Sequence, residues 1–377
     1  MRDDARRPSL DPALTGQEAA PNGTGPAGPA VPGGAIAVDA MGGDHGPSEI
    51  VAGAVAARRN GIPVVLTGRP GMLRPLLAAH NALADVPVIP AEDVLTMSEG
   101  ALASWRRPRS SIAVACQLVR RGQASAVVSA GSTAGIVATA RLRMHSVPGV
   151  SRPALAVLLP TRPSPTVLID AGAIADPRPE MLLQFAQLGV AYTQLAHGIA
   201  EPRVGLLTIG TEPGKGNKLA KRAHELLDAE PPHGGLPIGF IGNVEGTDLL
   251  TGKADVIVTD GFTGNVALKT LEGAAAFAAA GLRAAASASP GGRLTRRWRR
   301  QAVTDLTDLA DRLDPGHYGG AALLGLEGTV VIAHGAATAR NITAAAELAS
   351  SLVRGQITEK IRERIGYSRG GHFLRRA

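Results

Sequence analysis

Short apolar runs alternate with helix-like patterns along most of the chain. Most of these runs are apolar at every position, which is typical of strands that are covered on both faces in a mostly parallel sheet. The runs predicted to be strands are Ala35–Asp39, Pro63–Thr67, Ala126–Ser129, Leu155–Leu159, Thr166–Asp170, Val204–Thr208, Ile238–Ile241, Asp255–Thr259 and Thr329–Ala333.

Helical spacing of apolar residues follows many of the predicted strands. The segment Ser48–Asn60 places Ile50 and Val55 on one face, and Asn217–Ala229 shows the same kind of apolar stripe. This alternation of strands and helices predicts an α/β fold, a three-layer αβα sandwich, with a single domain over residues 35–367.

The segments outside this pattern are expected to form tails and a hairpin. Residues 1–34 are rich in Pro, Gly and Ala and contain no apolar core of a secretory signal, so we expect a disordered tail on a cytoplasmic protein. Residues 368–377 are expected to form a short basic tail. An Ala-rich helical pattern from Thr270 is followed by a Pro-Gly-Gly turn and a polar helix, so residues 271–313 are expected to form a projecting helical hairpin.

The composition excludes several classes of protein. Of the 377 residues, 45% are hydrophobic and 19% are charged, which excludes wholesale disorder. The single cysteine, Cys116, excludes a disulfide framework and a cysteine-based zinc cluster, and its helical surroundings predict a small buried hydrophobic residue. Aromatic residues make up only 3%, and we expect no nucleic-acid partner. The net charge of +7 fits an acidic partner, an anionic substrate or an anionic membrane surface equally well.

Polar, glycine-rich turns follow several predicted strands, where ligands bind in open parallel sheets. The first of these turns carries Asp39, Gly42, Gly43, Asp44 and His45. Its glycines allow a ligand to approach the backbone, and the helix that follows offers free N–H groups to an anion. A tight turn with capping acids explains the same residues equally well.

A second turn lies within Ser129–Gly135 and contains Gly131, Ser132 and Thr133. Its N–H groups and two hydroxyls can converge on a phosphate, although a plain helix-capping turn is an equally good interpretation. The turn lacks the Gly-Lys-Ser/Thr of a Walker loop and the three-glycine spacing of a dinucleotide-binding turn.

Further chemistry is expected after later strands. Lys215, one of only six lysines, lies between glycines just before a helix start at Asn217, so its ammonium group can meet an anion there; an exposed loop lysine is the alternative. Asn243 and Asn265 can donate side-chain N–H groups to a developing oxyanion, and Asp260, like Asp170 earlier in the chain, supplies a carboxylate at a strand end. Asx turns are common at strand ends, so each of these residues alone is a weak signal.

Long blocks of sequence at these turns resemble bacterial phosphate acyltransferases. Between about Ala35 and about Leu352 the blocks are IAVDAMGGDHGP, VVSAGST, KGNKLAKRAHELL, FIGNVEGTDLLTGKADVIVTDGFTGNVALKTLEG and YGGAALLGLEGTVVIAHG. The resemblance implies an αβα sandwich related to the phosphotransacetylase and isopropylmalate dehydrogenase folds, and a homodimer. It implies transfer of the fatty acyl group of acyl-[acyl-carrier protein] to inorganic phosphate, giving an acyl phosphate for glycerol-3-phosphate acylation in phospholipid synthesis. We expect no metal or cofactor.

This resemblance gives the turn residues roles in a direct transfer without a covalent intermediate. Lys215 would neutralise phosphate or protonate the tetrahedral oxygen, Asn265 with Asn243 would stabilise the oxyanion, and Asp260 would orient Lys215 or Asn265. The residues expected to bind phosphate or substrate are Asp39, Gly42, Gly43, Asp44, His45, Gly131, Ser132, Thr133, Asp170 and Asn217.

The chain departs from the family pattern at a few positions. Ser132 and Ile174 stand where the family usually has Asn, and Thr96–Gly100 replaces an acidic stretch. Two alternatives stay open: a phosphotransacetylase-like enzyme that uses acyl-CoA, and a catalytically weakened homologue that binds carrier protein or membrane.

A basic patch is expected on the hairpin. Such a patch attracts anionic lipid, with its Trp at the headgroup level, or an acidic carrier protein, and a packing or dimerisation element is the alternative. Because an acyl phosphate is lipophilic, we expect a cytoplasmic protein at the anionic membrane surface, beside a membrane glycerol-3-phosphate acyltransferase. The patch consists of Arg293, Arg296, Arg297, Trp298, Arg299 and Arg300.

Overall fold

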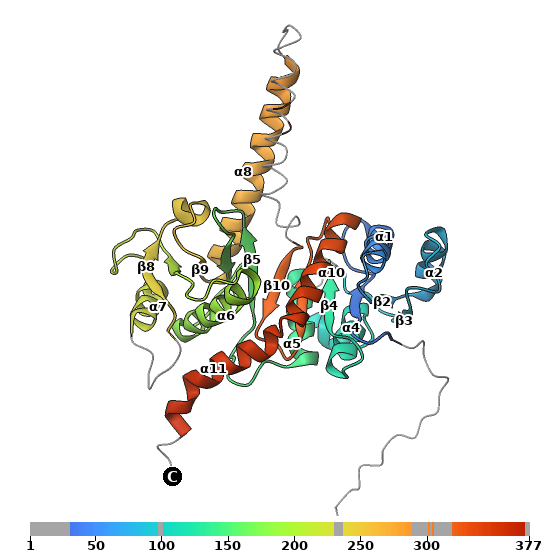
Figure 1. Ribbon diagram of the computed structural model, residues 1–377, viewed down its shortest axis with the longest axis horizontal. Helices are drawn as coiled ribbons and strands as arrows, with labels where there is room; N and C mark the ends of the chain where they lie inside the picture. Colours follow the sequence, from blue (N-terminus) through green and yellow to red (C-terminus); the bar gives the residue numbers. More distant parts are fainter. Residues whose placement is uncertain are drawn as a thin grey trace, which may run out of the picture.

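A central sheet with helices on both faces dominates the computed structural model (Figure 1). The model describes residues 31–96, 101–229, 237–288 and 319–373, together with Gln301 and Thr304. Within these residues the sheet has eleven strands, and most of the predicted strands are confirmed. They are β1 (Ile36–Asp39), β2 (Val64–Gly68), β3 (Val88–Pro90), β4 (Ala126–Ser129), β5 (Ala154–Leu159), β6 (Thr166–Ile169), β7 (Val204–Leu207), β8 (Phe240–Val244), β9 (Val256–Val258), β10 (Ala321–Leu324) and β11 (Thr329–Ile332).

Helices alternate with these strands, as the sequence predicts. They are α1 (Gly46–Arg59), α2 (Pro70–Ala79), α3 (Ala101–Arg106), α4 (Ser111–Arg120), α5 (Thr133–Met144), α6 (Pro179–His197), α7 (Lys218–Asp228), the 3₁₀ helix η2 (Gly246–Leu250), α8 (Gly261–Ala288), α10 (Ala339–Arg354) and α11 (Ile357–Phe373). One core layer lies between the sheet and α1, α2, α6, α7, α10 and α11, and the other lies between the sheet and α4, α5 and the start of α8. The three-layer αβα architecture is therefore confirmed.

The sheet consists of two parallel halves that run in opposite directions. Its strand order is β3-β2-β1-β4-β11-β10-β5-β6-β9-β7-β8. The pairings of β11 with β10, β10 with β5 and β5 with β6 are antiparallel, whereas the remaining pairings are parallel. The polar turns therefore do not share one edge of a single parallel sheet; they divide between two half-sheets that meet at the central strands.

The sequence pattern does not predict two of the strands, β3 and β10. The three-residue β3 ends in Pro90 at the sheet edge, and β10 consists only of Ala and Leu, which occur as readily in helices. β10 matters for the architecture because it supplies two of the antiparallel pairings that reverse the sheet direction.

Helix α8 begins earlier than expected and extends away from the α/β body (Figure 1, orange). The sequence pattern indicates a helix only from Thr270, whereas residues 261–265 already form the first turns of α8. Gly261 and Gly264 lower helix propensity, yet a Cβ at Gly264 would collide with the Asp170 carbonyl oxygen, so the glycines allow the helix to lie against the end of β6.

The expected hairpin and tails fall partly outside the described residues. The residues that are not described include most of 289–318, which contain the basic patch Arg293 to Arg300, and residues 1–30. α11 continues through Ser368 to Phe373, so the first residues of the expected basic tail are helical. None of the helices within the described residues has the length and apolar character needed to cross a bilayer.

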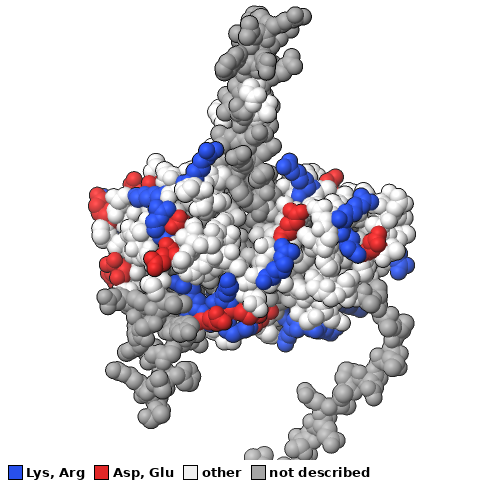
Figure 2. Space-filling view, viewed as in Figure 1, with Lys and Arg blue, Asp and Glu red and all other residues white. Residues whose placement is uncertain are grey.

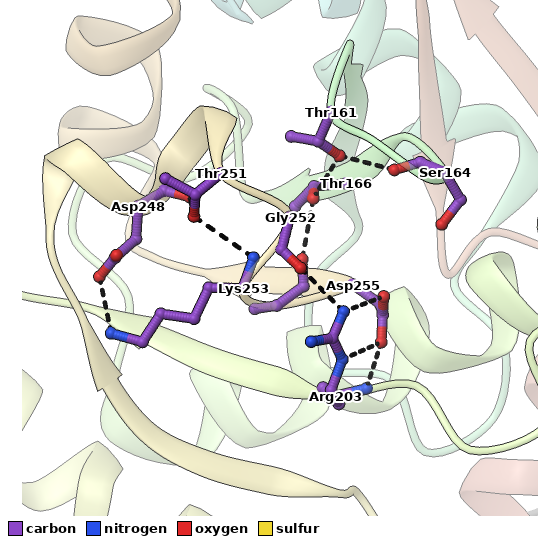
Figure 3. Close-up of polar contacts among 10 residues, drawn as sticks. Thr161, Ser164, Thr166, Arg203, Asp248, Thr251, Gly252, Lys253 and Asp255 are labelled. Atoms are coloured by element: carbon purple, nitrogen blue, oxygen red, sulfur yellow. Dashed lines mark hydrogen bonds and ion pairs between the residues drawn. The ribbon is translucent and has the colours of Figure 1, made fainter.

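A polar network stabilises the starts of β6, β7 and β9 (Figure 3). Arg203 donates from Nε and Nη2 to the two carboxylate oxygens of Asp255, at 3.0 and 2.9 Å, and Nη2 also donates to the Gly252 carbonyl at 2.8 Å. Nearby, Lys253 pairs with Asp248 at 3.0 Å. Burial raises the pKa of Asp255, but the hydrogen bonds and charge of Arg203 outweigh burial and hold it below its ordinary value.

The replacement Asp255→Asn is expected to lower the free energy of unfolding at pH 7 by about 1–2 kcal/mol, less than for a fully buried pair, because half of the Arg203 side chain faces water. Since folding lowers the Asp255 pKa, this stabilisation is complete above the unfolded pKa of about 4 and is lost as the pH falls through the folded pKa. Denaturant unfolding at pH 7 and below pH 3 measures the difference. Glu92→Gln, which breaks an exposed pair with Arg109, is the matched control and should change stability little.

Candidate functional site

A cleft of about 370 Å³ lies over the central strands, between α5 and α8. Its floor includes the apolar side chains of Leu155 and Val157 from β5 and Ile332 from β11. These residues belong to the core layer on the α5 side of the sheet. The cleft therefore lies where the two oppositely directed half-sheets meet, and its floor can accept an apolar group.

The N-terminus of α5 forms one rim of this cleft. Ser132 precedes the helix and caps it, because its Oγ accepts a hydrogen bond from the Gly135 N–H at 3.2 Å. Thr133 and Ala134, the first residues of α5, both line the cleft. The first N–H groups of a helix point out of its N-terminus along the helix axis and carry a partial positive charge, so this rim attracts an anion.

Helix α8 and the turn after β11 form the opposite rim. Asn265, Lys269 and Glu272 are spaced for one face of α8 and line the cleft together with His334. Lys269 Nζ donates to Glu272 Oε2 at 2.7 Å and lies 3.2 Å from His334 Nε2.

The sequence pattern does not single out Lys269, Glu272 or His334 as site residues. A helix start placed at Gly261 would have indicated the first two, because Lys269 follows Asn265 by four positions and lies on the same face. No such periodic signal exists for His334, which is brought to the cleft by the sheet.

The turn after β1 packs against the turn that carries His334. The Asp44 N–H donates to the Gly335 carbonyl at 2.7 Å, and the Met41 N–H donates to Asp39 Oδ1 at 3.2 Å. His45 precedes α1 without a side-chain capping bond. The Asp44 N–H is thus used to hold the turn that carries His334, and phosphate binding by residues 42–45 stays a prediction.

Asp39 and Asp170, both expected to contact substrate, are buried at the ends of β1 and β6. Asp39 Oδ2 accepts from Ser129 Oγ at 2.7 Å. Burial raises the pKa of both carboxyl groups, and their hydrogen bonds oppose the shift. The two aspartates therefore fix strand ends, and their carboxylates do not face the cleft.

Asp170 illustrates how firmly this end of β6 is held. Its carboxylate accepts N–H groups from Leu155, Gly172, Ala173 and Ile174, at 2.7 to 3.1 Å. At Ile174 the backbone makes this contact, and its carbonyl also accepts the Gly261 N–H at 2.9 Å. An Ile side chain at this position is thus compatible with the local structure.

A second cavity, of about 140 Å³, lies on the other side of the first turn of α8. Asp260 and Thr263 line it together with Thr208 and Asn217, whereas Asn265 lines the larger cleft. The Asp260 carboxylate accepts from the Thr263 N–H and Oγ, each at 2.8 Å. Asp260 therefore caps α8. Its carboxylate contacts Thr263, whereas the sequence analysis predicts a contact with Lys215 or Asn265.

Lys215 is exposed in the turn beside the second cavity, just before Asn217. Its N–H closes the turn by donating to the Glu212 carbonyl at 3.0 Å. Asn217 caps α7, with its Oδ1 accepting from the Ala220 N–H at 2.9 Å. Lys215 itself lines neither of these two cavities, whereas Asn265 lines the larger cleft.

Asn243 is buried in β8 and its side chain holds the turn that carries Lys215. Its Nδ2 donates to the Glu212 carbonyl at 2.7 Å, and its Oδ1 lies 2.9 Å from Nδ1 of the buried His224. Since an amide oxygen only accepts, His224 donates from Nδ1. One N–H of the Asn243 amide is therefore used within the protein, its role toward an oxyanion stays a prediction, and His224 is a supporting residue that the sequence pattern does not reveal.

Cys116 is completely buried in α4, which confirms its interpretation as a small hydrophobic residue. Burial raises the pKa of its thiol, so a thiolate nucleophile is strongly disfavoured.

The replacement Cys116→Ala is expected to change kcat/KM less than threefold, and intact mass spectrometry of the wild type during turnover should show no acylated enzyme. A stable acyl adduct on Cys116 would contradict direct transfer.

Comparison with known proteins identifies the family. The family model described as fatty acid synthesis protein matches residues 35–360. A phosphate acyltransferase of Thermobifida fusca is 59% identical over 343 residues, covering 90% of this chain and 94% of the relative. A phosphate acyltransferase of Thermus thermophilus is 44% identical over 330 residues, covering 88% and 98%.

Solved structures match the fold. A phosphotransacetylase from Streptococcus pyogenes has a TM-score of 0.56 at 18% identity, over 85% of this chain and 94% of that one. A branched-chain phosphotransacylase from Enterococcus faecalis has a TM-score of 0.53 at 14% identity, over 84% and 99%. The fold is thus shared with phosphotransacetylases, and the sequence match over nearly the whole domain shows that this chain belongs to the phosphate acyltransferase family.

Proposed function

We propose that this protein transfers the fatty acyl group of an acyl-[acyl-carrier protein] to inorganic phosphate. Membership of the phosphate acyltransferase family gives the coarse reaction, an acyl transfer that involves phosphate. The carrier-protein donor, direct transfer and a place before glycerol-3-phosphate acylation in phospholipid synthesis are our proposal.

The main support for the proposal is that a single cleft combines an apolar floor with a rim that attracts an anion. Leu155, Val157 and Ile332 offer a surface for the acyl group, and the N-terminus of α5 at Thr133 offers N–H groups to phosphate. Asn265 lines the same cleft from α8. An acyl thioester and a phosphate can therefore meet within one cavity.

In the proposed reaction a phosphate oxygen attacks the thioester carbonyl carbon, and a C–O bond forms as the carbonyl oxygen gains negative charge. Asn265 donates its side-chain N–H to this oxyanion. The C–S bond then breaks, and the leaving thiolate takes up the proton of hydrogen phosphate. Because phosphate is already an anion, holding it beside the carbonyl is the main catalytic task.

Lys215 supplies positive charge from the turn that leads to α7, beside the second cavity. Its flexible stem lies over Gly210, where an added Cβ would be only 2.9 Å from Lys215 Cγ. In the proposal this ammonium group neutralises phosphate or the tetrahedral intermediate, and Asp260 acts indirectly by fixing the start of the helix that carries Asn265.

Incubation with acyl-[acyl-carrier protein] and phosphate, followed by hydroxylamine trapping, tests the function. We expect an acyl hydroxamate that requires both phosphate and enzyme. The same assay with acyl-CoA tests the phosphotransacetylase-like alternative, which the fold shared with phosphotransacetylases favours. If kcat/KM with acyl-CoA equals or exceeds the value with acyl-[acyl-carrier protein], acyl-CoA is the donor. If neither donor gives a hydroxamate, the result favours a catalytically weakened homologue that binds carrier protein or membrane.

We further propose a homodimer that associates peripherally with an anionic membrane, beside a membrane glycerol-3-phosphate acyltransferase. On the described part of the face in Figure 2, basic side chains are interspersed with acidic ones. The proposal therefore depends on the sequence of the arginine-rich segment 293–300.

A further inference from the structure

The contact between Lys269 and His334 joins two elements at one rim of the cleft. Lys269 lies on α8, and His334 lies in the turn that follows β11. The Nζ and Nε2 atoms are 3.2 Å apart, and both residues line the cleft that Thr133 and Asn265 also line.

The hydrogen bonds of His334 determine which ring nitrogen carries the proton. The Ala336 backbone N–H donates to His334 Nδ1 at 3.1 Å. A backbone N–H is always a donor, so Nδ1 accepts and the proton of the neutral ring is on Nε2.

This assignment places two donors against each other. The Nε2–H of His334 faces the ammonium group of Lys269, and neither can accept from the other. Glu272 accepts from Lys269 at 2.7 Å and fixes its direction. An oxygen that accepts from both groups at once would turn this unfavourable contact into two charge-assisted hydrogen bonds.

We propose that Lys269 and His334 bind the phosphate that attacks the acyl donor. This inference rests on the proposed function and deepens it by naming two phosphate-binding residues for the cleft. Phosphate oxygens accept from His334 Nε2–H and Lys269 Nζ at one rim, while the first N–H groups of α5 face them at the other. Hydrogen phosphate can in turn donate its own O–H to Glu272, so this carboxylate does not exclude it.

The turn that carries His334 is held in place for this task. The Asp44 N–H donates to the carbonyl of the following residue, Gly335, and a Cβ on Gly43 would lie 3.1 Å from that same carbonyl oxygen. The glycine-rich turn after β1 thus contributes to phosphate binding by supporting His334.

Two pairs of variants test the assignment. Lys269→Met removes the charge and keeps the length, whereas Lys269→Arg keeps a donor. His334→Asn keeps a polar atom near the Nδ1 position and removes the Nε2 donor, whereas His334→Gln places an amide N–H near the Nε2 position. Lys253→Met, which breaks an ion pair with Asp248 away from the cleft, is the matched control.

The expected result is a selective loss of phosphate affinity. Lys269→Met and His334→Asn should raise the KM for phosphate at least tenfold and change the KM for the acyl donor less than twofold. Lys269→Arg and His334→Gln should stay within about threefold of the wild type, as should Lys253→Met. An unchanged phosphate KM in both damaging variants, with folding intact, would overturn the assignment.

A binding measurement separates this inference from the proposed function. Sodium phosphate, compared with sodium chloride at equal ionic strength, should raise the Tm of the wild type and of Lys253→Met, but not of Lys269→Met or His334→Asn. This result supports the phosphate site even if carrier protein proves to be the wrong donor. If phosphate stabilises all four proteins equally, the assignment fails while the acyl transfer itself can still stand.

Discussion

Replacing Asn265 by Ala is expected to lower kcat/KM for acyl transfer to phosphate at least a hundredfold while the fold survives. Asn265 is exposed in the first turns of α8 and lines the cleft, so few packing contacts are lost. One oxyanion donor typically contributes about 2.7–4 kcal/mol to transition-state stabilisation, which corresponds to a loss of roughly a hundredfold to a thousandfold.

The backbone that carries Asn265 is fixed at the start of α8. Asp260 caps the helix by accepting from the Thr263 N–H at 2.8 Å, and Gly264 lies so close to the Asp170 carbonyl oxygen that no Cβ fits between them. A donor that extends from a fixed backbone needs little reorganisation when the transition state forms.

Steady-state kinetics with circular dichroism checks this expectation. Val266→Ala, at the next and half-exposed position outside the cleft, is the matched control and should keep near wild-type kcat/KM. Asn265→Asp keeps the shape but removes the donor and adds a charge that repels phosphate, so it should be at least as damaging as Ala. Near wild-type turnover of Asn265→Ala would remove the residue from the mechanism.

Much of the fold could be predicted because the chain obeys local rules. The apolar runs at Ala126–Ser129 and Thr166–Asp170 coincide closely with β4 and β6, since both strands are covered on both faces and leave continuous apolar sequence. By contrast, β10 has no β-branched residue, and the reversal of sheet direction at β10 and β5 arises from long-range pairing that no local pattern encodes.

The candidate site was predictable only in part, because a sequence shows a polar side chain but not the partner that uses it. Asn265 lines the cleft, and its role as an oxyanion donor stays a prediction. Asn243 and Asp170, which looked equally suitable, are buried and bonded within the protein. His334 reaches the cleft through the pairing of β11 with β4, so only the tertiary structure reveals it.

Lys215→Ala is expected to lower kcat/KM at least a hundredfold, about 2.7 kcal/mol, because the variant loses the positive charge that opposes the anionic transition state. The turn that carries Lys215 is fixed by two donors to the Glu212 carbonyl, the Lys215 N–H and the Asn243 side chain. The ammonium group therefore extends from a rigid base although it is itself exposed.

Two further lysines close to Lys215 in the sequence provide controls for this prediction. Lys218 and Lys221 are also exposed, on the first turns of α7, so removing either changes the net charge as much as Lys215→Ala does. If a general positive field attracts phosphate, the three Ala variants will lose similar activity, and the loss will shrink as salt is added. If Lys215 acts on the reacting phosphate, its variant alone will fall a hundredfold at every salt concentration, and Lys215→Arg will recover part of the rate because it restores charge with a different geometry. Equal behaviour of the three variants would show that Lys215 contributes only through the long-range field of the protein.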